Sequence, residues 1–259
     1  MTDQIVLTPL DGLPLVEKGD DLCGIVVSGL EDAKIEPKAG DIFVGAQKVI
    51  SKAEGRTVDL NTVSPGKAAM DLATETGKDP RVVELILSES KSVIRKKTGV
   101  LIVEHNRGWI MANAGIDASN VSSSEGAENV LLLPLDPDES ARKLRDQLVA
   151  HFGCDIAVVI SDSFGRPWRI GTTGVAIGSA GLPSLWDRRG ETDLFGRELL
   201  VTQQAIGDEV ATAASLLQGQ TSEGRPVVHI RGLDYSAHAS AIERPAKDLI
   251  RDASEDLFR

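Results

Sequence analysis

Short apolar runs separated by polar, turn-forming residues recur along the chain, and this pattern is typical of β-strands. Six of these runs predict strands, at residues 5–9, 24–28, 41–45, 99–104, 129–134 and 226–230. A seventh run, Ile156–Ile160, is apolar at every position and predicts a buried strand. The basic segment 47–56 is interpreted as one more strand, either facing phosphate or lying at a sheet edge with a solvated face.

Helical periodicity appears in three places between these runs. Residues 80–92 and 206–217 repeat apolar side chains at the spacing of one helix face. The clearest helix follows Asp136, because a proline and a glutamate stand at its first and third positions, and Gly153 ends it. This helix leads directly into the run Ile156–Ile160, so rigid elements hold the residues that follow that strand.

Composition narrows the possible functions mainly by exclusion. Of the 259 residues, 41% are hydrophobic and 26% charged, which is ordinary for a globular protein. The formal net charge of -11 disfavours a general nucleic-acid binder, because such proteins need a basic face to replace counterions. The charge is compatible with a mononucleotide whose phosphates arrive with a divalent metal.

Signals for export or membrane insertion are not apparent in the sequence. The N-terminus has no basic region followed by a long apolar run, and no run is long enough to span a membrane. We therefore expect a cytoplasmic protein without a membrane partner. Cys23 and Cys154 have no metal-type spacing, so we expect two small buried side chains in a reducing compartment rather than zinc ligands.

Candidate chemistry concentrates after the predicted buried strand, in the stretch 161–174, which ends in a predicted Gly-Thr-Thr-Gly turn at 171–174. Asp162 and Ser163 offer hard oxygen ligands of the kind that Mg²⁺ or Mn²⁺ prefers. Arg166 and Arg169 offer fork-shaped donors that suit phosphate or carboxylate. The alternative interpretation is a polar loop capped by a surface ion pair.

A second cluster of polar side chains follows residue 112. The small residues 112–115 would let the backbone approach a ligand closely. Asp117, Ser119 and Asn120 then supply oxygen and amide groups. An Asx-rich turn that satisfies its own backbone is the alternative interpretation of this segment.

The two clusters together predict metal-dependent phosphoryl chemistry. Asp117 and Asp162 each follow a strand candidate and each adjoin hydroxyl or amide groups, as in two-metal sites that hold transferring phosphates. Lys48, Arg166 and the loop 218–225 are candidates for holding the rest of a nucleoside triphosphate. Neither a P-loop nor a dinucleotide-binding glycine motif occurs, and these residues alone do not identify the substrate.

Several longer motifs follow one another along the chain. They are Ala112–Asp117 with Ser119-Asn120, Leu133-Pro134 with Asp136–Asp138 and Ser140–Arg142, Ser161–Arg169, and Asp193 with Phe195–Arg197. In residues and in order, these motifs closely resemble the coenzyme F420-0:gamma-glutamyl ligase family. Lys48–Arg56 and Gly219-Gln220 fit as well, and the resemblance extends from about residue 10 to residue 232. The family usually has a methionine where this chain has Gln218.

The resemblance implies an activity that the residues alone do not. Members of the family attach L-glutamate to a deazaflavin coenzyme precursor, with GTP as co-substrate. The carboxylate of the phospholactyl group becomes an acyl phosphate, which the glutamate amine attacks, and further glutamates are joined through their side-chain carboxylates. The resemblance also implies two divalent ions, Mg²⁺ or Mn²⁺, and a monovalent cation such as K⁺.

The matching motifs also imply site residues. The implied metal ligands are Asp117 and Asp162 for one ion, and Ser163 and Gln220 for a second. The implied nucleotide contacts are Leu13, Pro14, Leu15, Val16, Lys48, Asn120, Gln218, Gly219, Gln220, Thr221, Ser222, Glu223, Gly224 and Arg225. Arg166 and Arg169 are our own assignment to substrate phosphate or carboxylate, and with the two aspartates they complete the candidate catalytic set.

The fold that the resemblance implies is mixed α/β (α+β), with mixed sheets flanked by helices, two intertwined lobes and a homodimer. We expect residues 1–259 to form one ligase unit, without a sub-lobe boundary that the sequence can assign. Two alternative functions remain open at this point. One is a sensor that binds a nucleotide or a deazaflavin without catalysis, and the other is an amide ligase for a different acid.

Overall fold

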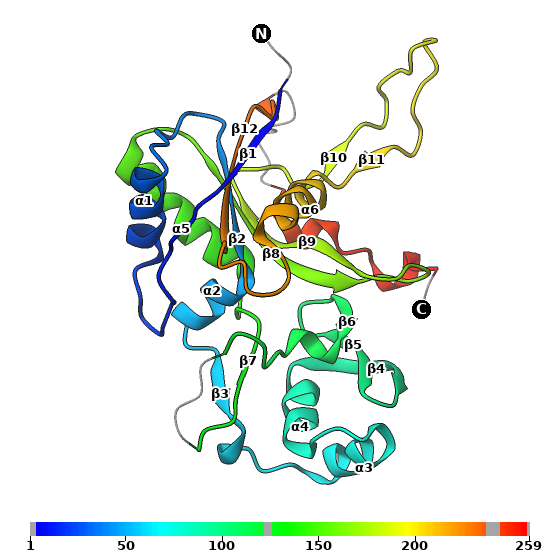
Figure 1. The fold of residues 1–259 in the computed structure, drawn as a ribbon. Helices are drawn as coiled ribbons and strands as arrows, with labels where there is room; N and C mark the ends of the chain where they lie inside the picture. The colour runs from blue at the N-terminus through cyan, green and yellow to red at the C-terminus, as the bar shows by residue number, and fades with distance from the viewer. Residues whose placement is uncertain (1–3, 122–125, 237–243, 258–259) are drawn as a thin grey trace.

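A five-stranded mixed sheet forms the centre of the larger part of the molecule (Figure 1). The computed structural model describes residues 4–121, 126–236 and 244–257. The strands lie in the order β1-β12-β2-β8-β9. They are β1 Val6–Pro9, β2 Ile42–Ala46, β8 Ala157–Gly165, β9 Thr172–Ala180 and β12 Val227–Arg231. Of the pairs within this sheet, β2 with β8 is parallel and the others are antiparallel.

Helices cover both faces of this sheet. Helices α1 (Leu22–Asp32) and α5 (Pro137–Phe152) pack on one face, where Val158 and Ile160 point. Helix α6 (Ile206–Gln218) packs on the other face, against the alternate residues of β8. Because successive side chains of a strand point to opposite faces, the apolar residues 157–160 of β8 fill two cores at once.

The smaller part of the molecule lies below this sheet in Figure 1 and is formed by the chain between α2 and α5. Its sheets are β3 (Thr57–Asp59) with β7 (Asn129–Leu131), and β4 (Ser90–Lys97), β5 (Val100–His105) and β6 (Ile110–Ala112) in that order. Its helices are α3 (Lys67–Thr76), α4 (Pro80–Ser88) and the 3-10 turns η1 (Leu60–Thr62) and η2 (Asn113–Gly115). Val83, Ile86 and Leu101 are fully buried in its core.

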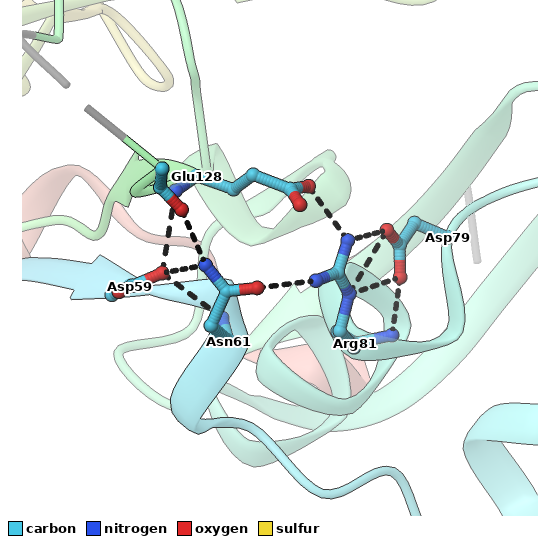
Figure 2. Close-up of polar contacts among 6 residues, drawn as sticks. Asp59, Asn61, Asp79, Arg81 and Glu128 are labelled. Carbon is cyan, nitrogen blue, oxygen red and sulfur yellow. Dashed lines mark hydrogen bonds and ion pairs between the residues drawn. The ribbon is translucent and has the colours of Figure 1, made fainter. Parts of the chain in front are cut away.

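A polar network connects the outer elements of this smaller part (Figure 2). The Arg81 guanidinium lies 2.6 Å from Asp79 and 2.7 Å from Glu128. Asn61 donates to Asp59, the N-cap of η1, at 3.0 Å. The hydrogen bonds that Arg81 donates to Asp79 and Glu128 raise the pKa of Arg81 above its usual value, so this permanently charged group ties the segments of Asp79 and Glu128 together.

Five short elements complete the described chain. Helix α2 (Gln47–Ala53) follows β2 directly. Strands β10 (Trp186–Asp187) and β11 (Gln203–Gln204) form the base of a hairpin that projects from the body of the molecule (Figure 1). Two 3-10 turns, η4 (Ala246–Leu249) and η5 (Ala253–Glu255), lie near the C-terminus. No helix in the described ranges is long and apolar enough to cross a membrane.

The structure confirms the mixed α+β fold class and most of the predicted elements, including the capped helix. There the Asp136 carboxylate accepts from the Glu139 N–H at 3.2 Å, and Gly153 closes the helix in the left-handed conformation. The predicted strand 226–230 is β12, and the predicted helix 206–217 is α6. The predicted helix 80–92 ends earlier, at Ser88, and strand β4 begins at Ser90.

Two predicted strands are wrong. Residues 24–28 lie inside helix α1, where Val26, Gly29 and Leu30 are buried at helical spacing. A short apolar run fits a strand or a buried helix equally well, and here the run is part of a longer helix. The segment 47–56 is not a strand of either predicted kind, because residues 47–53 form α2.

The stretch after Ile160 also differs from the prediction. Strand β8 continues to Gly165, so Asp162 lies within a strand rather than beyond its end. Most of the Gly-Thr-Thr-Gly sequence 171–174, which predicts a turn, belongs to β9. Gly174 is needed there for packing, since a Cβ atom at this position would lie 2.4 Å from the Ala211 carbonyl oxygen.

The two cysteines are unpaired, as expected, but both are half-buried rather than fully buried. Burial raises the pKa of each thiol above its ordinary value, so neither is a ready thiolate.

Candidate active site

The parallel pair of strands brings two candidate residues to one edge of the sheet. Ala46, the last residue of β2, pairs with Ser161 of β8. Lys48 follows two residues later in the first turn of α2, and Asp162 follows Ser161 directly. Parallel strands run in the same direction, so the residues after each of them emerge side by side.

Asp117 reaches the same edge from the smaller part of the molecule. Its backbone exchanges hydrogen bonds with Leu131, at 3.1 and 2.8 Å. Three consecutive residues before it, in η2, have positive φ angles of 52°, 54° and 70°. A Cβ atom on the last of these, Gly115, would lie 2.8 Å from the Leu133 side chain. Gly115 therefore serves core packing, and the close approach of a ligand to this backbone stays a prediction.

A compact polar cluster forms where these segments meet, and we call Lys48, Asp117, Ser119 and Asp162 the acid-pair cluster. The Lys48 ammonium lies 2.7 Å from the Asp117 carboxylate and 2.6 Å from the Ser119 hydroxyl. Ser119 donates its N–H and its hydroxyl to Asp117, at 2.8 and 2.6 Å. The Asx turn that was the alternative interpretation is thus present, and Lys48 joins it.

The two acids of the acid-pair cluster have opposite electrostatic environments. Burial alone would raise the pKa of Asp117, but hydrogen bonds from Lys48 and Ser119 outweigh it and lower that pKa below its usual value. Burial raises the pKa of Asp162 to about 6, and the negative charge of Asp117 contributes to the rise. The Ser163 N–H and the positive charge of Lys48 lower this pKa, but they offset only part of the rise. Lys48 pairs directly with Asp117 and acts on Asp162 only through its charge, so the charge of Asp162 is incompletely compensated.

The donor set suits a hard divalent cation. In the part of the chain that the structure describes, no three His, Cys, Asp or Glu side chains gather as a metal site. Asp117 and Asp162 would supply two carboxylates, and hydroxyl, amide, water or phosphate oxygens would complete the coordination. This is the usual manner of binding Mg²⁺, which combines one or two carboxylates with waters and substrate phosphates.

The residues implied for a second metal come from the other face of the sheet. Side chains alternate along β8, so Ser163 lies on the face opposite to Asp162. Ser161 is on that same face and donates to Gln218 at 3.2 Å. The loop that carries the exposed Gln220 starts at this point.

Gln218 holds the end of α6 to the sheet. Its amide nitrogen donates to the carbonyl oxygens of Val44 and Pro226, both at 3.3 Å. Gln218 therefore has a structural role that the family's usual methionine could not fill at this position, because a thioether cannot donate hydrogen bonds.

The loop after α6 folds over the segment that carries Asn120. The Asn120 amide donates to the Thr221 carbonyl oxygen at 3.0 Å, and Lys52 donates to the Asn120 carbonyl oxygen at 2.7 Å. The Glu223 side chain turns back under its own loop and accepts from the Thr221 N–H at 2.8 Å. Gly219 permits this, because a Cβ atom there would lie 2.1 Å from Glu223.

The remaining nucleotide candidates lie around this loop and along the chain after β1. Ser222 and Gly224 are exposed, and Arg225 pairs with Asp11 at 2.6 Å. Leu13 and Val16 line a small apolar cavity of about 20 Å³ between α1, α2 and the sheet, whereas Pro14 and Leu15 are exposed. That cavity has space for roughly one water molecule, so these two side chains pack the core rather than form an open pocket.

Arg166 and Arg169 lie apart from the acid-pair cluster. Both are exposed, and the Arg166 guanidinium donates to the Gly171 carbonyl oxygen at 3.2 Å across the β8–β9 turn. Arg166 comes four positions after Asp162, just beyond the end of β8, which corresponds to about 13 Å of extended chain. Their assignment to substrate phosphate or carboxylate stays a prediction.

One residue outside the predicted site belongs to its geometry, since Lys52 holds the Asn120 backbone. Ser119, which the sequence groups with Asp117 and Asn120, contacts both Lys48 and Asp117. Burial, together with the charge of Lys48, lowers the pKa of Lys52. The signal was present in the sequence: a helix over residues 47–53 places Lys48 and Lys52 on one face, four residues apart.

Comparisons with known proteins agree on one family. The family model described as F420-0:Gamma-glutamyl ligase matches residues 12–232. A coenzyme F420:L-glutamate ligase from Methanothermobacter thermautotrophicus is 44% identical over 255 residues, covering 98% of this chain and 99% of the relative. Relatives of the same name are 45% identical in Methanopyrus kandleri (96% of this chain, 97% of the relative) and 39% identical in Archaeoglobus fulgidus (99% and 97%). The chain belongs to the F420-0:gamma-glutamyl ligase family.

Proposed function

We propose that this protein is a GTP-dependent ligase that joins L-glutamate to the deazaflavin coenzyme precursor F420-0. Relatives that match almost the whole chain are named for ligating L-glutamate to coenzyme F420. The observation in this chain that carries the proposal is the acid-pair cluster, in which Lys48, Asp117 and Asp162 converge from three segments far apart in sequence. A lysine beside two half-buried carboxylates is an arrangement suited to a metal-bound nucleotide phosphate.

The proposed reaction has two covalent steps. A carboxylate oxygen of F420-0 attacks the γ-phosphorus of GTP, and the bond from that phosphorus to the β–γ bridging oxygen breaks, which releases GDP. The glutamate amine then attacks the acyl carbon, the C–N bond forms, and phosphate leaves with the electrons of the C–O bond. The amine loses its proton in this step, and the product is an amide. Repetition on the new side-chain carboxylate extends a γ-linked chain.

The residues of the acid-pair cluster have distinct parts in this proposal. Asp117 and Asp162 hold a divalent ion, which when bound neutralises phosphate charge and polarises the γ-phosphoryl group. Lys48 presents a positive charge to the same phosphate oxygens, 2.7 Å from Asp117 in the protein alone. Ser119 fixes the Asp117 carboxylate through two hydrogen bonds, so that its oxygens are oriented in advance.

The experiment is a turnover assay with purified protein, GTP, Mg²⁺ or Mn²⁺, L-glutamate and F420-0, read by mass spectrometry. We expect products heavier by successive glutamyl units, with one GDP released per unit. Asp162→Asn should lose this activity, whereas Asp71→Asn, which changes an exposed acid on α3, should retain it. GTP that binds without being consumed would indicate a sensor instead, and consumption only with another acceptor would indicate a ligase for a different acid.

Homodimerisation is part of this proposal. The projecting β10–β11 hairpin carries Leu194 and Phe195 with 99% and 87% of their surface exposed. Apolar side chains this exposed are what a second copy of the chain would cover. Light scattering should give a mass near twice 27.6 kDa, and replacing both side chains with serine should shift it toward the monomer.

A further inference from the structure

A second, larger cavity lies at the free edge of strand β9. Its volume is about 210 Å³. The walls come from the turn 108–110, from β8 and β9, from the first turn of α6, and from the C-terminal residues 246–256. A single water needs about 10–15 Å³ by this measure, so the cavity has room for a ligand of roughly ten or more non-hydrogen atoms. We call it the β9-edge cavity.

The C-terminal wall of the β9-edge cavity is firmly held. The buried Asp138 carboxylate accepts from the N–H groups of Ser179, Ala246 and Lys247, at 2.9, 2.9 and 3.2 Å. Ile250 packs against Gly108, where a Cβ atom would lie 3.2 Å from it. The cavity is therefore bounded by two fixed surfaces rather than by a loose tail.

The lining of the cavity combines apolar side chains with charged side chains of both signs. Ile110, Phe164 and Val175 are among the side chains that supply the apolar surface. Asp208 and Asp256 bring carboxylates, and Arg251 brings a guanidinium. The Asp208 carboxylate accepts from the Ala176 N–H at 2.9 Å, which is its one hydrogen bond among the described residues. A ligand that matches this lining carries an ammonium group, a carboxylate and a short carbon chain.

The β9-edge cavity adjoins the acid-pair cluster. Val175 lines the cavity and is the cross-strand partner of Asp162. Phe164, which also lines it, lies two residues beyond Asp162 and therefore on the same face of β8. A molecule in this cavity can thus present one of its ends to the site where the phosphorylated carboxylate is proposed to form.

From this geometry we propose that the β9-edge cavity binds the amino-acid substrate, L-glutamate. Its α-carboxylate pairs with Arg251, and its amino group lies between Asp208 and Asp256 before it reacts. The inference rests on the proposed ligase function. It adds a site for the amine donor, formed partly by residues beyond the 12–232 region that the family model matches.

The test is the kinetics of the full-length Arg251→Gln variant. Loss of a charge-assisted pair to a carboxylate should raise the KM for L-glutamate about tenfold or more, with the KM for GTP unchanged and kcat within about twofold. Arg244→Gln is the matched control, since this arginine precedes η4 and does not line the cavity. 4-Aminobutyrate, which lacks the α-carboxylate, should compete with L-glutamate weakly in the wild type, whereas in Arg251→Gln its inhibition constant should lie close to the KM for L-glutamate.

Each outcome separates this inference from the proposed function. Wild-type ligation with an unchanged KM for L-glutamate in Arg251→Gln would overturn the cavity assignment and leave the ligase intact. If the wild type shows no ligation, the proposed function fails, and calorimetric titration with L-glutamate then tests the cavity assignment separately. L-Glutamate binding to the wild type that is lost in Arg251→Gln would support the assignment. Absence of binding to both proteins would refute it.

Discussion

Replacing Asp162 with asparagine should stabilise the metal-free protein while it removes the activity. The carboxylate is half-buried beside Asp117, and burial raises its pKa to about 6 from an ordinary value of 3.8. The folded protein therefore binds this proton more tightly than the unfolded chain does. Above pH 6 the folded state holds an ionised group whose charge it does not fully compensate, and asparagine removes that charge.

The magnitude follows from the shift. A difference of about two pKa units corresponds to about 3 kcal/mol at pH 7, since each unit is worth 1.36 kcal/mol. Asp162 keeps part of its surface in contact with solvent, which screens the charge, so about 1–2 kcal/mol is expected for the variant. In a chain of this size, that gain raises Tm by about 2–8 °C.

The assay is thermal unfolding of the wild type and Asp162→Asn in EDTA, from pH 3 to pH 8. Because the folded-state pKa is raised, the contribution of Asp162 to wild-type stability falls as pH rises from about 4 to about 6, and the gap between the proteins opens in that window. Asp117→Asn is the matched control, for which the expected change in stability has the opposite sign. Its pKa is lowered by Lys48 and Ser119 against burial, so its ionised form stabilises the fold and the variant should be less stable at pH 7.

Two results would refute this reasoning. Asp162→Asn could be less stable than the wild type at pH 7 without metal, or the gap could be the same at pH 3.5 and pH 7. Saturating Mg²⁺ with GTP provides a second comparison, because a ligand that binds the folded state stabilises only the protein that retains its site. The wild type should then become the more stable of the two.

Three further changes test other parts of the structure. Lys48→Met should lower GTP consumption by on the order of 10²-fold in the ligase assay, because it removes the cation of the acid-pair cluster. Gly178→Ala should cost about 3 kcal/mol in urea unfolding, since the new Cβ would lie 2.2 Å from the Pro137 carbonyl oxygen and separate α5 from β9. Gln218→Met should cost about 1 kcal/mol in the same assay, with the KM for GTP within about twofold of the wild type, if its hydrogen bonds to Val44 and Pro226 serve the fold alone.

Local patterns in the sequence determined the elements whose signals are complete within a few residues. Helix α5 was predicted from its cap to its final glycine, because the Asp136 cap and Gly153 act on neighbouring backbone groups. The strand Ile156–Ile160 was predicted because both faces of β8 are buried and every residue in the run is apolar. Asp117 and Asp162 were singled out because each follows a predicted strand and adjoins hydroxyl or amide groups that could complete a metal site.

Tertiary structure decided what such patterns leave ambiguous. The apolar run 24–28 suits either a strand or a buried helix, and only packing against α5 and the sheet selects the helix α1. The sequence also could not show that Lys48 and Asp117, 69 residues apart, share one ion pair at 2.7 Å. That contact depends on the pairing of β3, which follows α2, with β7 and on the backbone exchange between Asp117 and Leu131. Pairings between distant segments form because together they bury apolar surface and satisfy backbone hydrogen bonds, and no short stretch of sequence records which partners achieve this.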